Sequence, residues 1–148
     1  MRLVVGGDHA GYRLKVLIAD TLRREGHEVI DVGTGGEEPV DFPDVTEALC
    51  RHLLDGSAER GVLVCGTGIG AGMAANKIAG IRAALAHDLY SAHQAVEHDD
   101  ANVLCLGAQI VGPIIAMELI RNFLAATWEG GPDYTRRLEK LRLLERGR

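Results

Sequence analysis

The chain lacks a long hydrophobic segment and a recognisable leader. None of its apolar runs approaches the roughly 18 residues expected of a membrane-spanning helix. The N-terminus enters a strand-like run at residues 3–5 (LVV) without the basic segment, apolar stretch and cleavage site of a secretory signal. We therefore expect a cytoplasmic protein that has no membrane partner.

Cysteine is scarce and widely spaced. The three cysteines, Cys50, Cys65 and Cys105, form no CxxC pair and no Cys/His cluster at zinc spacing. An odd number of separated thiols is typical of a reducing compartment, where cysteines stay free. The sequence predicts neither a disulfide framework nor a metal site, and we expect no cofactor.

Positive charge is also in short supply. Lysine and arginine together number 16 against 21 acidic residues, a net charge of -5, which argues against a nucleic-acid partner. Several basic residues gather near the C-terminus: Arg136, Arg137, Lys140, Arg142, Arg146 and Arg148. Such a run is typical of a solvated helix face. The remaining composition, 47% hydrophobic over 148 residues, indicates a single globular domain spanning residues 1–148.

Short apolar runs alternate with helical patterns along the chain. The strand-like runs are residues 2–6, 28–32, 61–65, 82–86 and 102–106. The helical patterns are residues 12–24, 45–54, 71–79, 89–97, 113–126 and 133–145. This alternation predicts an α/β fold with a parallel sheet covered by helices on both faces. Ligands of such folds bind at the carboxyl ends of the strands.

One glycine-rich segment, residues 64–76 (VCGTGIGAGMAAN), carries the clearest chemical signal. A strand-like run ends at Cys65, a turn follows, and a helix begins. Amides in such a turn and the helix dipole attract negative charge. A thiol there suits a base that removes a proton next to a carbonyl, with the amides holding the oxyanion. Cys65 is equally consistent with a buried core thiol, and Thr67 with a hydroxyl that shapes the turn.

Other chemistries fit this segment less well. Gly66, Gly68 and Ala71 satisfy a relaxed dinucleotide fingerprint, but it follows the third strand and leaves no room for a substrate domain. A cysteine phosphatase needs an arginine six positions after the cysteine, where Ala71 stands. Disulfide exchange needs a second nearby cysteine. Proton transfer therefore remains as the preferred interpretation.

Two histidines lie beside acidic residues near predicted strand ends. His9 follows Asp8 after the first strand, and His98 lies within residues 97–102 (EHDDAN), ahead of the last strand. Segments of this composition also form turns and caps, so a structural role stays open for both. A histidine among acidic groups is also a candidate proton carrier at neutral pH.

Several motifs occur in one order: residues 6–12 (GGDHAGY), 29–34 (VIDVGT), 41–43 (DFP), 65–70 (CGTGIG), 74–77 (AANK), 80–83 (GIRA) and 98–104 (HDDANVL). Together they resemble type B ribose-5-phosphate isomerase and its relative galactose-6-phosphate isomerase over nearly the whole chain. The resemblance implies a Rossmann-like three-layer αβα sandwich with a five-stranded parallel sheet. It also implies a homodimer or tetramer with active sites at the subunit interface, and a last helix that packs on a partner subunit.

The resemblance further implies metal-free interconversion of aldose and ketose phosphates through an enediolate. Cys65 matches the base that moves the proton between C1 and C2, and Thr67 matches the residue that assists proton transfer at the substrate oxygens. His98 matches the acid that opens the furanose ring in the neighbouring subunit. Substrate-binding roles fall on Asp8, His9, Gly66, Gly68, Ile69, Gly70, Asp99 and Arg136.

Three positions depart from the common family pattern. Asp99 stands where asparagine is usual, and Gln109 and Pro132 stand where phosphate-binding arginines are frequent. The leading interpretation is an isomerase of ribose 5-phosphate and ribulose 5-phosphate. The alternatives are an isomerase of a hexose 6-phosphate, a tetrose phosphate or a weakly phosphorylated sugar, or a non-catalytic nucleotide- or phosphate-binding module.

Overall fold

The computed structural model describes residues 1–145, so Arg146 and Arg148 lie outside the described residues. The strands are β1 (Arg2–Gly7), β2 (Glu28–Gly33), β3 (Arg60–Cys65), β4 (Ala83–Leu85) and β5 (Val103–Gly107). The helices are α1 (Tyr12–Arg24), α2 (Phe42–Leu54), α3 (Ile69–Ala75), α4 (Leu89–Asp99), α5 (Pro113–Ala125) and α6 (Pro132–Glu145). No helix of this part of the chain is long and apolar enough to cross a membrane.

The five strands form one parallel sheet in the order β2-β1-β3-β5-β4, which confirms the predicted sheet. At its centre, Val5 of β1 pairs with Val62 of β3, and Val62 pairs with Leu104 of β5. The chain leaves β1 toward β2 on one side and returns to β3 on the other. A crevice at the carboxyl ends of β1 and β3 is where such a sheet accommodates a ligand.

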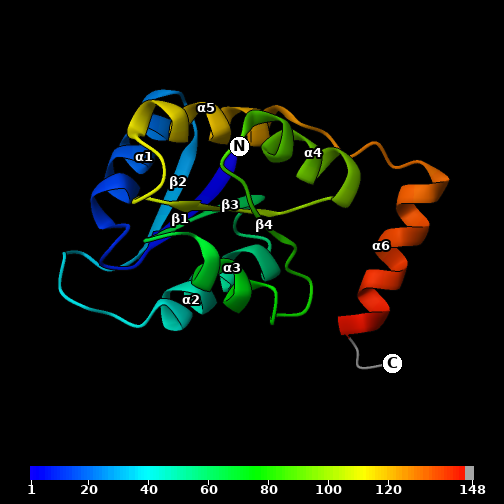
Figure 1. The fold of residues 1–148 in the computed structure, drawn as a ribbon, viewed down its shortest axis with the longest axis horizontal. Helices are drawn as coiled ribbons and strands as arrows, with labels where there is room; N and C mark the ends of the chain where they lie inside the picture. The colour runs from blue at the N-terminus through cyan, green and yellow to red at the C-terminus, as the bar shows by residue number, and fades with distance from the viewer. Residues whose placement is uncertain (146–148) are drawn as a thin grey trace.

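Helices cover both faces of the sheet, as predicted (Figure 1). The helices α1, α4 and α5 lie on one face, and α2 and α3 lie on the other. Side chains alternate along β3, so Val62 packs with the first group and Leu63 packs with the second. The helix α6 stands apart from these layers (Figure 1), and Leu138 is its buried residue.

Two predicted elements are shorter than expected because side chains occupy backbone groups. The Arg82 N–H donates to Asn102 Oδ1 over 2.8 Å, so β4 begins at Ala83 instead of residue 82. The amide side chain of Asn76 bonds both backbone groups of Ala83, each over 2.9 Å. This contact ends α3 at Ala75, four residues before the predicted end.

Candidate functional site

The predicted glycine-rich turn wraps around the thiol at the end of β3. Cys65 is 6% exposed, and the Gly68 N–H donates to its sulfur over 3.0 Å. Gly68 adopts a left-handed conformation (φ +81°) that favours glycine, and this conformation directs its N–H back to the sulfur. The Ile69 N–H donates to Thr67 Oγ1 over 3.3 Å. Thr67 is exposed, so its hydroxyl and the nearly buried thiol belong to one short turn but differ in their access to solvent.

Ile69 and Gly70, two residues of the predicted anion pocket, have different surroundings. Ile69 opens α3 and is 53% exposed. A Cβ on Gly70 would lie 3.1 Å from the Phe42 ring, so Phe42 of α2 lies close over this part of the turn. The turn is therefore closed on the α2 side and open at Thr67 and Ile69.

Asp8 and His9 follow β1, the neighbour of β3 in the sheet. Asp8 is buried, its N–H donates to the Val64 carbonyl over 3.3 Å, and its Oδ1 accepts the Gly11 N–H over 3.0 Å. A Cβ on Gly11 would lie 2.1 Å from the Val64 carbonyl oxygen, so only glycine permits this approach. His9 Nδ1 accepts the Val40 N–H over 3.2 Å, which leaves the proton on Nε2. Asp8 and His9 therefore lie at the carboxyl end of β1, next to the carboxyl end of β3, where Cys65 lies.

The segment after β5 forms the third side of the turn. The Ala108 N–H donates to the Cys65 carbonyl over 2.8 Å, and the Gln109 N–H donates to the Gly66 carbonyl over 3.0 Å. A Cβ on Gly66 would lie 3.2 Å from Gln109 Oε1, so the Gln109 amide lies against the glycine-rich turn. The position that departs from the family pattern is thus in direct contact with the predicted anion pocket.

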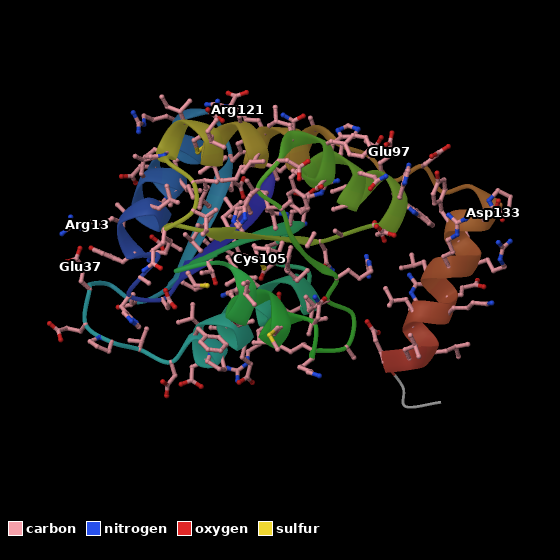
Figure 2. The ribbon with its side chains drawn as sticks, viewed as in Figure 1. Arg13, Glu37, Glu97, Cys105, Arg121 and Asp133 are labelled. Carbon is pink, nitrogen blue, oxygen red and sulfur yellow. The ribbon has the colours of Figure 1, made fainter. Side chains whose placement is uncertain are left out.

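A cavity of about 390 Å³ opens beside His9. Arg13 and Glu37 line it, and their side chains form an ion pair. Figure 2 shows the two labelled side chains together at one end of the molecule. Nothing in the sequence indicated this ion pair, because one charged residue on a predicted helix carries no signal about its partner.

His98 lies near the amino ends of the strands, whereas Cys65 lies at the carboxyl end of β3. The helix α4 runs back along the sheet and ends at Asp99, and the Asn102 carbonyl accepts the Gly61 N–H at the start of β3. Cys65 is four positions farther along β3 than Gly61. At about 3.3 Å per residue, Gly61 and Cys65 are about 13 Å apart along the strand. The structure therefore does not bring His98 and Cys65 of one chain together.

Asp99 and Arg136 belong to the same side of the molecule as His98. Asp99 ends α4, and Arg136 on α6 forms an ion pair with Asp133 over 2.6 Å. Figure 2 places Glu97 and Asp133 on this side, away from Cys105 in the sheet. The predicted site residues thus separate into two groups, one at the carboxyl edge and one around α4 and α6.

A cavity of about 610 Å³ lies between α6 and the α3–β4–α4 region, and of the second group Asp99 lines it. Arg82 and Asp99 supply charge to its lining, and Leu141 and Leu144 supply apolar surface. Both leucines are largely exposed, at 42% and 55%. A single chain therefore leaves two leucines of α6 uncovered next to Asp99.

The three cysteines share one apolar cluster but differ in their surroundings. Burial raises the pKa of Cys50 to about 11. Burial also raises the pKa of Cys105, and the neighbouring Cys65 and Cys50 add to the shift. Among residues 1–145, no group of three or more His, Cys, Asp and Glu side chains could hold a metal ion.

Comparison with known proteins gives a consistent result. A family model described as Ribose/Galactose Isomerase matches residues 3–141. D-erythrulose-4-phosphate isomerase of Pectobacterium atrosepticum is 44% identical over 88% of this chain and 87% of its own. Ribose-5-phosphate isomerase B of Escherichia coli is 38% identical over 99% and 98%. The solved structure of ribose-5-phosphate isomerase B from Clostridium thermocellum superposes with a TM-score of 0.97, at 42% identity over 99% of both chains.

Proposed function

The chain belongs to the ribose/galactose isomerase family, and we propose on this basis that it interconverts ribose 5-phosphate and ribulose 5-phosphate. Relatives named ribose-5-phosphate isomerase B, matched over nearly their whole length, support this substrate pair. The observation that carries the proposal is the Cys65 thiol, anchored by the Gly68 N–H inside a turn of backbone amides. A module that only binds phosphate has no need of a thiol there.

Cys65 acts as the base on the open-chain sugar. Its thiolate takes the proton from C2 of the aldose, and the C–H electron pair forms the C1–C2 double bond. The carbonyl electrons move to O1, where the amides of residues 66–70 other than those of Gly68 and Ile69, which bond Cys65 and Thr67, stabilise the negative charge. The thiol then returns the proton to C1, while the Thr67 hydroxyl passes a proton between O2 and O1.

Ring opening falls to His98 of the partner subunit. The separation of His98 and Cys65 on opposite sheet edges supports a site shared by two chains. The uncovered leucines of α6 and the adjoining cavity support a homodimer or tetramer in which α6 packs on the partner. Asp99 and Arg136 then serve the partner's site, while Asp8 and His9 serve their own. The whole chain, residues 1–148, works as one isomerase domain.

The chain's free thiols support a cytoplasmic enzyme. Cys50, Cys65 and Cys105 are all unpaired with one another. Thiols persist in this form in a reducing compartment. The proposed chemistry also depends on a reduced Cys65.

A tetrose phosphate is the second candidate substrate. Relatives named D-erythrulose-4-phosphate isomerase match this chain at 44% and 38% identity. The structural observation that favours this substrate is Gln109, an uncharged amide against the glycine-rich turn. A substrate that sits differently in the pocket needs different phosphate contacts.

The first test is Cys65→Ala, with Cys50→Ala as the matched loss of a buried thiol. Loss of a general base lowers kcat by about 10²–10⁴-fold, whereas Cys50→Ala should retain turnover. Isomerisation should be measured on ribose 5-phosphate, erythrose 4-phosphate, a hexose 6-phosphate and free ribose. Near wild-type turnover by Cys65→Ala would refute the proposed base. Preference for a sugar other than ribose 5-phosphate would refute the proposed substrate and leave the base intact.

A further inference from the structure

Tyr134 and His98 form a pair that joins α6 to the end of α4. Their rings are stacked, with centroids 4.6 Å apart and an interplanar angle of 28°. The Tyr134 hydroxyl lies 3.2 Å from His98 Nε2. The stacking fixes the plane of the imidazole, and the hydrogen bond fixes which edge of the ring faces the protein.

Charged groups from three segments surround this pair. Glu97 on α4 and Glu129 between α5 and α6 place carboxylate oxygens 3.7 and 4.0 Å from His98 Nε2. The Glu129 N–H donates to the Glu97 carbonyl over 2.9 Å, which ties the two segments together. Arg137 Cζ lies 5.5 Å from the centroid of the Tyr134 ring. His93 Nε2 lies 3.7 Å from Glu97 Oε1.

These contacts distinguish the two imidazole nitrogens. Acceptor oxygens gather at Nε2, so a proton on this nitrogen is favoured. Burial raises the pKa of the Tyr134 phenol, and the charge of Glu129 adds to the shift, so the hydroxyl keeps its proton at neutral pH. Within the described residues, the hydrogen bond of the His98 ring goes to Nε2. Nδ1 is therefore the ring nitrogen that is available to contact a sugar.

We propose that Tyr134 is the positioning residue of the ring-opening histidine. It holds His98 by Nε2 so that Nδ1 faces the furanose ring of the substrate in the partner's site, where Nδ1 takes the proton of the O1 hydroxyl and passes it to the ring oxygen as the C1–O4 bond breaks. This inference rests on the proposed function, because it requires His98 to open the ring. Tyr134 itself does not touch the substrate.

The test compares a reaction that needs ring opening with one that does not. Conversion of ribose 5-phosphate begins from a furanose. Ribulose 5-phosphate cannot form a furanose because its C5 oxygen carries the phosphate, so deuterium uptake from solvent at C1 reports the Cys65 step alone. Tyr134→Phe keeps the stacked ring and removes the hydroxyl. Tyr90→Phe is the matched control, because Tyr90 on α4 is 73% exposed and its hydroxyl bonds Gln94.

Tyr134→Phe should lower kcat on ribose 5-phosphate by roughly 3- to 10-fold, as expected for one lost hydrogen bond, with KM unchanged. Deuterium uptake into ribulose 5-phosphate should be unaffected, and Tyr90→Phe should match wild type in both assays. His98→Asn with Tyr134→Phe should be no slower than His98→Asn alone, because residues that act through one group are not additive. Nitrogen NMR should show a defined Nε2–H tautomer of His98 that Tyr134→Phe disperses.

Two results would overturn the inference alone, provided that His98→Asn still impairs only the conversion of the cyclic sugar. The first is that Tyr134→Phe and Tyr90→Phe convert ribose 5-phosphate at the same rate. The second is that Tyr134→Phe loses equal activity in the ribose 5-phosphate and the deuterium-uptake assays. A His98→Asn variant that converts ribose 5-phosphate normally would overturn the ring-opening role and the inference together. Failure of the wild-type enzyme to convert ribose 5-phosphate would also overturn both.

Discussion

At the scale of single residues, the position of a thiol in the cluster decides its chemistry. Cys50 and Cys105 are fully buried, the first on α2 and the second inside β5. Cys65 shares their cluster but ends its strand at an amide-rich turn. The same side chain is therefore a packing group at two positions and the proposed base at the third.

This difference predicts selective alkylation by iodoacetamide at pH 7.5, measured by peptide mass spectrometry. Burial disfavours the charged thiolate and raises the pKa of Cys50 to about 11, well above this pH, so the Cys50 thiol stays protonated. Cys65 should be modified with loss of activity, and ribose 5-phosphate should protect it. Labelling of Cys50 should rise as the pH approaches 11. Equal labelling of the three cysteines in the folded protein at pH 7.5 would contradict this assignment.

At the scale of elements, α4 runs from the carboxyl ends of the strands back to their amino ends. It starts at the carboxyl edge with Asp88 as N-cap, whose side chain accepts the Ser91 N–H over 2.8 Å. Its C-cap is Asp100, a non-glycine residue in the left-handed conformation (φ 51°). Arg82 stabilises that end through the Asp100 carbonyl and carboxylate, each over 2.6 Å. The caps of one helix thus determine where His98 lies.

Asp88→Ala should lower Tm by about 2–4 °C, because the first turn loses its cap. Asp88→Asn retains an acceptor oxygen and is the control that should remain close to wild type. The hydrogen bonds from Ser91 lower the pKa of Asp88 below its ordinary value of 3.8. Because the pKa is lower in the folded state, ionised Asp88 stabilises the fold at pH values above its ordinary pKa. This contribution is lost as the pH falls through the lowered pKa of the folded state. The Tm difference between Asp88→Ala and wild type should therefore shrink below pH 4, and a constant difference would contradict this role.

Local patterns predicted the elements that depend on local sequence. The apolar periodicity of α1 predicts its observed bounds, and the glycine turn predicts the loop after β3. Asn76 with Ala83 and Arg82 with Asn102 are contacts between separate segments, and these contacts set the ends of α3 and β4. Periodicity carries no information about such pairs, so those ends were predicted wrongly. The contacts of Gln109 with Gly66 and of Tyr134 with His98 escaped prediction for the same reason.

At the scale of the whole molecule, the candidate site is divided between two ends of the chain. Cys65, Asp8 and His9 lie at the carboxyl ends of the strands, and His98 lies near their amino ends, stacked against Tyr134 of α6. The helix α6 stands away from the sheet layers (Figure 1) and leaves leucines uncovered. Two chains related by a twofold axis can each supply the part that the other lacks.

Complementation between two inactive variants tests this central claim most directly. Cys65→Ala and His98→Asn should each be inactive or strongly impaired on ribose 5-phosphate. When the two are co-expressed, half of the dimers are mixed, and one of the two sites in each mixed dimer has both residues intact. Specific activity on ribose 5-phosphate should then recover to about a quarter of wild type in a shared twofold site. Activity no higher than the average of the two separate variants would contradict a site built from Cys65 of one chain and His98 of its partner.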